Sequence, residues 1–595
     1  PGMVALGGAG GGGNEGRVQV DGQNTGATLN GGGVSGYRQD VENAAEIAMT
    51  TAGGLGETEV GGPTMNIVPK TGGNTFQSHF FFTGLRGGMQ ASNYTDELKA
   101  EGLSTPAVTN YIYDTSVSVG GPIVRDRLWF YALAYYRGQE STIPGMFHNR
   151  NAGDITKWTY EADTSRPAVS GGRGPIQPNL RLTFQVTPRN KANVFWDEQI
   201  SNNSIGAGSP TSAPETGGFN HGWQRVQQVK WTSTATNRLL LEAGEINTAS
   251  TGCSRERPGK ERRFNQVEEQ CAGGCASNGG IAGLDYRAQN SWNADWIGAH
   301  TWNAAGTYVT GSHSMKIGYQ GAFHVDNRAP SGQTVSYRVN NGVPNRITEY
   351  LRDYRTLSRV RFHALYVQDQ WTRGRLTAQG ALRYDHSWSY YPEQQIGGTR
   401  FLPAVTVFPE SKGVIGYNDI TPRMGLSYDL FGTGRTALKF NAGRYLEAAV
   451  NGNGNYSSLL PASRVPVSVT RTWTDANRNF VPDCILENPL AQDLRASGGD
   501  FCAAISNANF GISTPTLAYD PQIMQGWGVR PGDWQIGVTV QQEIVPRVSL
   551  EVGYTRRWLQ NFTVTNNLLQ DASDYTEFSI TAPSDPRLPG GGGYA

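Results

Sequence analysis

Apolar and polar residues alternate one by one along many short segments of the chain. Residues 179–187, 375–388, 533–541 and 547–555 are clear examples. A period of two places the apolar side chains on one face of a β-strand and the polar side chains on the other. Such a strand suits a wall between two environments, with its apolar face toward lipid and its polar face toward a wet interior. The pattern predicts an all-β protein.

The connections between the expected strands are alternately short and long. We expect fifteen strands, at 75–85, 111–119, 127–137, 178–187, 190–200, 221–232, 237–247, 289–302, 314–325, 359–371, 375–388, 419–430, 435–447, 532–545 and 547–562. Short turns include 187–190 and 372–375, whereas the long gaps include 248–288 and 448–531. Outer-membrane barrels have short periplasmic turns and long outer loops. The spacing therefore predicts a transmembrane antiparallel β-barrel.

The composition agrees with this fold class and excludes others. The 595 residues include 77 glycines, and only 17% are charged, as is common in β-rich chains with many turns. Fifty basic and fifty acidic residues balance each other, so the charge predicts no nucleic-acid partner. No run of eighteen apolar residues occurs, which excludes a transmembrane helix. The mean hydropathy of −0.46 does not argue against a barrel, because lipid-facing and lumen-facing residues average out.

Aromatic residues gather near the ends of the expected strands. They include Trp129, Phe130, Tyr131, Trp371, Trp388, Trp534 and Trp558. Membrane barrels place such residues in girdles at the two membrane interfaces. We therefore expect outer-membrane lipid to surround the protein.

A glycine-rich segment, residues 41–76, precedes the first expected barrel strand. It predicts a short helix or strand, a glycine-rich turn, a strand at 65–69, a second turn at 72–74 and a new strand from residue 75. The glycines allow the backbone to reverse direction within a few residues. We expect a small element with two tight turns in front of the barrel.

Several motifs resemble those of TonB-dependent outer-membrane receptors. Residues 20–22 (VDG) and 46–49 resemble elements of the receptor plug, and 61–74 resembles the last plug strand and its exit into the barrel. Residues 366–371 (YVQDQW) and 419–425 (DITPRMG) resemble barrel-strand motifs of these proteins. The motifs follow the order found in these receptors, and together the resemblance covers most of the chain. The glycine-rich plug and large loops are most similar to the Oar-like, carboxypeptidase-regulatory-type branch.

This resemblance implies a domain division. Residues 1–74 would form the C-terminal part of a plug, and residues 75–595 a transmembrane barrel that is incomplete at its C-terminus. Plugged transporters have 22 strands, so about 15 of them would be present and the chain would be truncated at both ends. The residues expected to form the plug-to-barrel motif are Gly61, Gly62, Asn66, Lys70, Gly72, Gly73 and Asn74.

The resemblance also implies a function in the cell outer membrane. The protein would take up an extracellular ligand in an energised step, with the TonB complex of the inner membrane as partner, although the TonB box is absent from this chain. One alternative is a barrel whose long outer loops serve adhesion or outer-membrane assembly. A second is a secreted all-β carbohydrate-binding protein, which would not explain the alternation of short and long connections.

The sequence shows no catalytic constellation. A nucleophile elbow and an HExxH motif are both absent, and the eight histidines are scattered singly. The glycine run at 8–13 formally satisfies GxGxxG but lacks the strand and helix that such a motif requires. We therefore expect no enzymatic activity, no cofactor and no metal site.

Two features of the expected loops remain open. Cys484 and Cys502 have a spacing compatible with a loop disulfide, and Cys253 could pair with Cys271 or Cys275. Residues 475–483 contain Asp and Asn at intervals that suit either Ca²⁺ or an Asx-turn within a long loop. The segment lacks the glycine and the distal glutamate of an EF-hand loop, which favours the Asx-turn.

Overall fold

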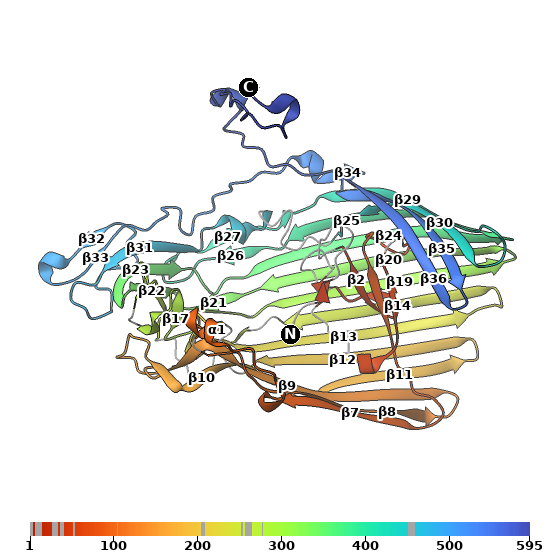
Figure 1. Cartoon of the computed structure of the whole chain (residues 1–595), viewed down its shortest axis with the longest axis horizontal. Helices are drawn as coiled ribbons and strands as arrows, with labels where there is room; N and C mark the ends of the chain where they lie inside the picture. Colours follow the sequence, from red (N-terminus) through yellow and green to blue (C-terminus); the bar gives the residue numbers. More distant parts are fainter. Residues whose placement is uncertain are drawn as a thin grey trace.

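The fold was obtained from a computed structural model. It describes residues 4–5, 15–26, 34–35, 41–51, 54–103, 105–203, 209–251, 254–255, 264–275, 278–449 and 459–594. A large barrel sheet occupies most of this part, with a small sheet inside it and a second sheet beyond one end (Figure 1). No helix in these ranges is long and apolar enough to span a membrane.

The barrel sheet consists of long strands that pair almost entirely with their neighbours in sequence. Its members are β7 (Gln77–Arg86), β8 (Thr109–Val124), β9 (Leu128–Asn149), β10 (Ala162–Arg173), β11 (Gln177–Thr187), β12 (Asn190–Asn203), β13 (Phe219–Thr234), β14 (Leu239–Thr251), β15 (Ser254–Arg255), β18 (Ser291–Asn293), β19 (Trp296–Thr310), β20 (His313–Arg328), β21 (Pro330–Gly332), β24 (Thr356–Arg373), β25 (Leu376–Tyr391), β28 (Ser411–Lys412), β29 (Gly416–Asp429), β30 (Thr436–Leu446), β34 (Gln525–Trp527), β35 (Gly532–Val545) and β36 (Val548–Gln560). The pairs are antiparallel except for the short β29–β34 contact.

All fifteen predicted strands correspond to strands of this sheet, so the predicted fold class is confirmed. Some boundaries were wrong. The strand expected at 289–302 is divided into β18 and β19, and β19 continues to Thr310. β8 continues past Gly120 and Gly121 to Val124, because Pro122 lies beside a register shift where a missing N–H is tolerated. β10 was not predicted.

The two faces of the wall differ as the alternation predicts. In β24, Leu365 and Val367 are more than half exposed, whereas Ala364 and Tyr366 are buried on the inward side. The same alternation repeats along β11, β13, β29 and β35. The outward face is therefore apolar, as contact with lipid requires.

The outer loops build a sheet of their own, which the sequence analysis missed by treating these segments as loops. Its order is β17-β16-β22-β23-β31-β33-β32, comprising β16 (Val267–Glu269), β17 (Leu284–Tyr286), β22 (Val335–Asn340), β23 (Val343–Tyr350), β31 (Ser468–Thr474), β32 (Gln492–Asp493) and β33 (Phe501–Cys502). We call it the outer sheet. It lies at the left end in Figure 1, opposite the short turns. Trp473, Ile347 and Leu284 are almost fully buried in its core.

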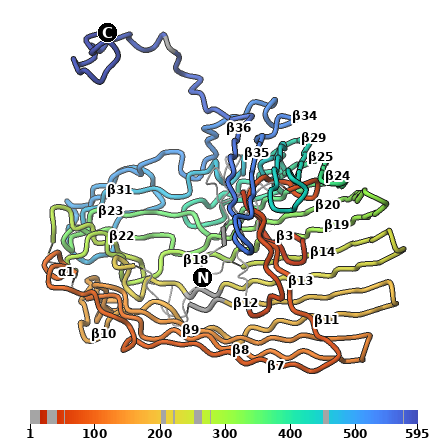
Figure 2. The backbone as a smooth tube through the Cα atoms, turned by 45° about the vertical axis from the view of Figure 1, so that its right-hand side comes forward, coloured from red at the N-terminus to blue at the C-terminus, as the bar shows by residue number. Residues whose placement is uncertain are grey.

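The remaining elements are short. A two-stranded sheet joins β26 (Gln394–Ile396) to β27 (Thr406–Phe408). The helices are α1 (Asp96–Ala100) and the 3₁₀ segments η2 (Val41–Asn43), η3 (Gly87–Met89), η4 (Pro214–Thr216), η5 (Asn278–Gly280), η7 (Pro461–Arg464), η8 (Arg495–Ser497), η9 (Pro521–Ile523), η10 (Ala572–Asp574) and η11 (Pro589–Gly591). The chain after β36 extends away from the barrel (Figure 2).

The sheet inside the barrel has the order β3-β2-β6-β5. Its strands are β2 (Arg17–Val20), β3 (Gln23–Asn24), β5 (Ala44–Thr50) and β6 (Thr64–Pro69), and β1 (Val4–Ala5) pairs separately with β4 (Val34–Ser35). Both views show these red segments crossing the lumen (Figures 1 and 2). We call the described residues between 15 and 74 the plug, because of their place inside the barrel, while the expected division of the chain into 1–74 and 75–595 stays a prediction. The strand predicted at 65–69 is β6, while the expected strand from residue 75 begins two residues later, at β7.

Candidate functional site: the contact between plug and barrel

One short plug segment is bonded to the barrel wall along its whole length. Residues 54–59 cross the lumen between the plug strands β5 and β6, and each of the six is hydrogen-bonded to the barrel or its loops. We call this segment the latch. Its partners lie on β20, β24, β25, β29 and β30 and just before β35. The barrel residues are Lys316, Gln320, Gln368, Arg383, Arg423, Tyr445, Leu446 and Arg530.

Gly56 lies at the closest approach of the latch to the wall. Its N–H donates to Gln368 Oε1 at 3.0 Å, and its carbonyl accepts from Arg383 Nη1 at 2.9 Å. A Cβ on Gly56 would lie 2.9 Å from the ring of Tyr366, closer than packed carbon atoms allow. A glycine is therefore required at this position.

Two wall arginines bind the latch backbone. Arg423 donates through Nη1 to the carbonyls of Leu55 and Thr58 and lies over the ring of Tyr445 at 4.4 Å. Arg383 is fully buried and is held by bonds of 2.8–3.0 Å to Asp385. Because Asp385 fixes its orientation, the remaining Arg383 nitrogen points at the latch.

Glu59 connects the latch to three other parts of the chain. Its carboxylate accepts from Arg530 Nη2 at 2.5 Å and from the Ala449 N–H at 2.8 Å, and lies 3.5 Å from Arg17 Nη2. Burial raises the pKa of Glu59, but the guanidinium groups of Arg530 and Arg17 outweigh this effect and lower the pKa to about 2. Glu59 is therefore charged at neutral pH.

A second contact is made by the turn between β2 and β3. Asp21 has φ 49° and Gly22 φ 83°, which favours short polar residues and glycine. The turn carries Asp21 to Arg181 of β11, where Oδ2 and Nη1 are 2.8 Å apart in a buried ion pair. Val20 packs against Phe195 and other apolar side chains of the wall. The VDG motif thus anchors the plug to a second part of the wall, formed by β11, β12, β13 and β14.

The predicted plug-to-barrel glycines divide into two groups. A Cβ added to Gly61 would lie 2.2 Å from Gln535 Nε2. A Cβ on Gly62 would lie 2.0 Å from the Glu15 carbonyl oxygen, and a Cβ on Gly72 would lie 2.1 Å from the Phe130 carbonyl oxygen. Each of these three glycines lies where the backbone closely approaches another group. Gly73 has nothing within 4 Å, so the structure gives no packing reason for a glycine there.

The other three predicted motif residues make different contacts. Asn74 accepts from the Asp126 N–H at 2.9 Å and from Trp129 Nε1 at 2.8 Å, which ties the plug exit to the turn between β8 and β9. Asn66 accepts from the Gly22 N–H at 2.7 Å. Lys70 contributes its backbone N–H, which donates to Asn43.

The sequence analysis did not single out four residues that make these contacts, Glu59, Arg383, Arg423 and Arg530. A signal was available for two of them. Arg423 lies in the 419–425 motif and Arg383 on the polar side of a predicted strand, which places both side chains in the lumen. Their partner is distant in sequence, so the pairing itself required the structure.

Comparison with known proteins identifies the family. The family model of the outer membrane beta barrel domain matches residues 175–570. The chain belongs to this family. It is therefore a protein of the cell outer membrane, and the predicted location is confirmed. A search of curated proteins by sequence finds no match.

The fold of this barrel protein is similar to that of a solved outer-membrane transporter. The outer membrane transporter YddB from Escherichia coli aligns with a TM-score of 0.58 at 12% identity, covering 93% of this chain and 62% of YddB. The chain thus spans less than two thirds of that relative. The siderophore receptor PirA from Acinetobacter baumannii aligns with a TM-score of 0.47 at 12% identity, covering 91% and 62%. A mutant of the ferric enterobactin receptor PfeA from Pseudomonas aeruginosa gives 0.48 at 11%, covering 94% and 67%.

Two cavities of this barrel protein border the latch. One of about 390 Å³ is lined by Glu57, Lys316 and Gln320, and another of about 70 Å³ by Arg17, Glu59 and His324. Glu57 and Gln320 line both cavities. Both cavities therefore lie beside the latch, along the wall formed by β19 and β20.

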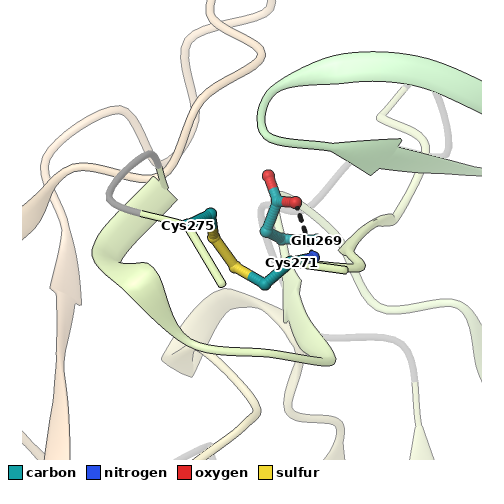
Figure 3. Close-up of side chains that lie close together, drawn as sticks. All are labelled: Glu269, Cys271 and Cys275. Carbon is teal, nitrogen blue, oxygen red and sulfur yellow. Dashed lines mark hydrogen bonds between the residues drawn. A yellow bond between two sulfur atoms is a disulfide. The ribbon is translucent and has the colours of Figure 1, made fainter. Parts of the chain in front are cut away.

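The outer sheet contains a cluster of potential metal ligands, Glu269, Cys271 and Cys275 (Figure 3). The structure bonds Cys271 to Cys275 rather than either of them to Cys253, which lies outside the described residues. Glu269 is fully buried and accepts four N–H donors, from Cys271, Asn278, Asn341 and Gly342. A carboxylate offers about four acceptor positions. The cluster is therefore satisfied without a metal ion.

The loop at 475–483 also directs its oxygens to backbone amides. Asn477 and Asn479 each accept from the backbone N–H two residues on, that of Asn479 at 3.1 Å and that of Val481 at 2.7 Å, which is the arrangement of an Asx-turn. A disulfide joins Cys484, the residue directly after this loop, to Cys502. The oxidised state of this pair in the cell stays a prediction.

Proposed function

We propose that the protein is an outer-membrane receptor that takes up a ligand through its plugged barrel in an energised, TonB-dependent step. The observation that supports this proposal is the latch, because each of its six consecutive residues is hydrogen-bonded to the barrel or its loops. Displacing this segment would enlarge the cavity of about 390 Å³ that it borders.

The chemistry of the latch suits reversible displacement. Its contacts are hydrogen bonds and ion pairs in a polar lumen, so water can replace each partner when the segment moves. A typical hydrogen bond contributes a net of only about 1 kcal/mol. An apolar contact of the same area would expose hydrophobic surface to water when it separates, which costs about 25 cal/mol per Å². The latch could therefore exchange its contacts with the wall for contacts with water when a partner in the inner membrane pulls on the plug.

The test locks the latch to the wall. In the full-length protein, Glu57→Cys and Lys316→Cys would be joined by a short, reducible thiol cross-linker, because the two side chains form a 2.5 Å ion pair. Uptake of radiolabelled ferric chelates, cobalamin and oligosaccharides would be measured in cells with and without TonB. We expect uptake of one probe class that requires TonB, stops on cross-linking and returns after reduction.

The control is Glu57→Cys alone, which receives the same reagent but cannot be cross-linked to the wall. It should retain uptake. Equal accumulation in cells with and without TonB would contradict energised transport, and so would unchanged uptake by the cross-linked protein.

A second function, attachment to a surface or protein, is favoured by the outer sheet. This sheet has its own buried core around Trp473 and Ile347, so it can present a rigid surface. An attachment protein would bind its target equally well in cells that lack TonB and would show no uptake.

A further inference from the structure

The plug sheet has one polar and one apolar face. Strand pairing places Gln19 of β2 beside Asn66 of β6, and Thr64 of β6 beside Thr50 of β5. Paired residues of neighbouring strands point to the same face, so these four polar side chains lie together. The opposite face carries the apolar side chains of Val18, Val20, Ile47, Met49, Met65 and Ile67. The plug therefore turns a surface of amides and hydroxyls to one side.

This polar face borders the cavity of about 390 Å³ beside the latch. We call it the plug cavity. Its other side is the wall formed by β14, β19 and β20, which Figure 1 shows beside the red plug strands. Glu242 and Lys316 line it, each three residues after its strand begins at a short turn. With a rise of about 3.3 Å per residue and a tilt of about 45°, they lie about 7 Å above the turns. Small-molecule sites have volumes of about 300–1,000 Å³, so the plug cavity can hold a small ligand near the short-turn end.

Several hydrogen-bonding groups of the plug cavity have no partner in the protein. Within the described residues, the side chains of Gln19, Thr50 and Thr64 form no hydrogen bond. Asn66 and Asn303 also line the cavity. Their side-chain oxygens accept bonds from the plug, and their NH₂ groups have no partner in the same ranges. Donors and acceptors on both sides of the cavity are therefore available to a ligand.

The plug cavity has no unpaired charge in the part of its lining that the structure describes. Glu57 pairs with Lys316 at 2.5 Å, and Glu242 pairs with Lys230 at 3.5 Å. A charged ligand would lose its hydration here without gaining a counter-charge of its own, which is costly. The lining therefore favours a polar ligand without net charge.

The polar face recognises a ligand through side chains. Its middle strand, β6, pairs with β2 on one side and with β5 on the other, so the backbone groups of β6 are used within the plug sheet. Extended peptides commonly bind by adding a strand to an exposed sheet edge, and the middle of this face offers no such edge. A ligand with many hydroxyl groups fits the side-chain amides and hydroxyls better than a peptide does.

We propose that the plug cavity binds an uncharged sugar, a mono- or disaccharide, as the sugar leaves the barrel. Each sugar hydroxyl can donate and accept a hydrogen bond, as the serine and threonine hydroxyls do, which matches the available groups on the two sides. Ala305 and Tyr366, which also line the cavity, offer apolar surface to the C–H groups of the sugar ring. This proposal deepens the proposed uptake function and rests on it for the route of the ligand.

The test measures sugar binding to the full-length protein in detergent, without TonB. Isothermal titration would use maltose, cellobiose and lactose as probes, with the unaltered protein and with the double variant Gln19→Met/Thr64→Val. Both substitutions keep the size of the side chain and remove its hydrogen-bonding groups. We expect one or more of the sugars to bind the unaltered protein, and to bind the double variant about tenfold more weakly because two hydrogen bonds are lost.

The matched control is Gln395→Met/Thr406→Val, which makes the same two changes at exposed positions of β26 and β27. It should leave sugar binding unchanged. Heat-modifiable gel mobility verifies folding, and Thr50→Val replaces either cavity substitution that prevents folding.

Three results would overturn the proposal. None of the three sugars binds, or the control variant loses as much affinity as the cavity variant, or N-acetyl-trialanine amide binds more tightly than every sugar, which would assign the cavity to peptides. Failure of the uptake function would look different. Sugar binding that depends on Gln19 and Thr64, together with equal accumulation in cells with and without TonB, would reject energised uptake and leave the binding site in place.

Discussion

The two faces of the barrel wall use the same side chain in opposite ways. In the lumen, Arg383 and Arg530 are buried and bind carboxylates and carbonyl groups of the protein. On the lipid side, Arg361 and Arg556 lie over aromatic rings and have no carboxylate partner in the described ranges. The difference shows that a guanidinium is placed according to the counter-charge its surroundings supply. Inside, the protein supplies it, through Asp385 of the same strand for Arg383 and through Glu59 of the plug for Arg530.

The largest expected effect comes from removing one lumen partner. Arg530→Met leaves the buried Glu59 with less compensating charge. The free energy needed to separate the plug from the barrel should therefore fall by about 3–5 kcal/mol. The matched change on the other face, Arg556→Met, should cost less than about 1 kcal/mol in detergent. Chemical denaturation followed by hydrogen exchange in the plug measures both. Similar losses for the two variants would abolish the contrast between the faces.

Acid should weaken the lumen side. The pKa of Glu59 is about 2 in the folded protein against an ordinary value of 4.5, so its contribution to stability is present above pH 4.5 and is lost as pH falls from about 4.5 toward 2. We expect a loss of about 3 kcal/mol across this window. The measurement is the unfolding free energy of the plug contact at a series of pH values. Glu59→Gln should flatten this part of the profile, and a slope equal to that of the unaltered protein would contradict the assignment.

Packing against the wall gives a smaller effect. Gly56→Ala brings a Cβ to 2.9 Å from Tyr366, and we expect a destabilisation of about 1–3 kcal/mol. Gly73→Ala is the control in the same plug, since nothing lies within 4 Å, and it should be close to neutral. Thermal unfolding of the two variants side by side decides whether the latch is tightly packed or loosely seated.

The smallest effect concerns the exposed edge of the plug. Asn74→Ala removes the acceptor for the Asp126 N–H and for Trp129 Nε1. Water reaches this site, so the cost should be about 1 kcal/mol. The measurement is hydrogen exchange at the Asp126 amide, which should become faster in the variant. Exchange at Gly56, which lies deeper in the lumen, should stay unchanged.

The barrel wall could be predicted from sequence because its physics is local. Alternation in β11 or β35 depends only on neighbouring residues, and the short turns follow from the spacing. The contact of Arg383 with the Gly56 carbonyl joins residues 327 positions apart, and no periodic pattern encodes such a pair. β8 extended past its predicted end because Pro122 is tolerated at a register shift.

The outer sheet was missed for a related reason. β22 and β23 form a local hairpin, but β16 pairs in parallel with β22, and β31 joins β23 from a third loop. Each contributing strand is short, and its partners come from other loops. In these loops the sequence shows only long connections between barrel strands. No single loop carries the whole hydrophobic core, which forms only when the three segments come together.

This shared sheet has a consequence for how the protein can vary. In a barrel with independent loops, each loop can lengthen or change without disturbing the others. Here three loops contribute β16, β22 and β31 to one sheet. An insertion in one loop therefore moves a strand with which a strand from another loop must pair. Natural variants should therefore change these three segments together, and grafting a single loop from a relative should fail where exchange of all three succeeds.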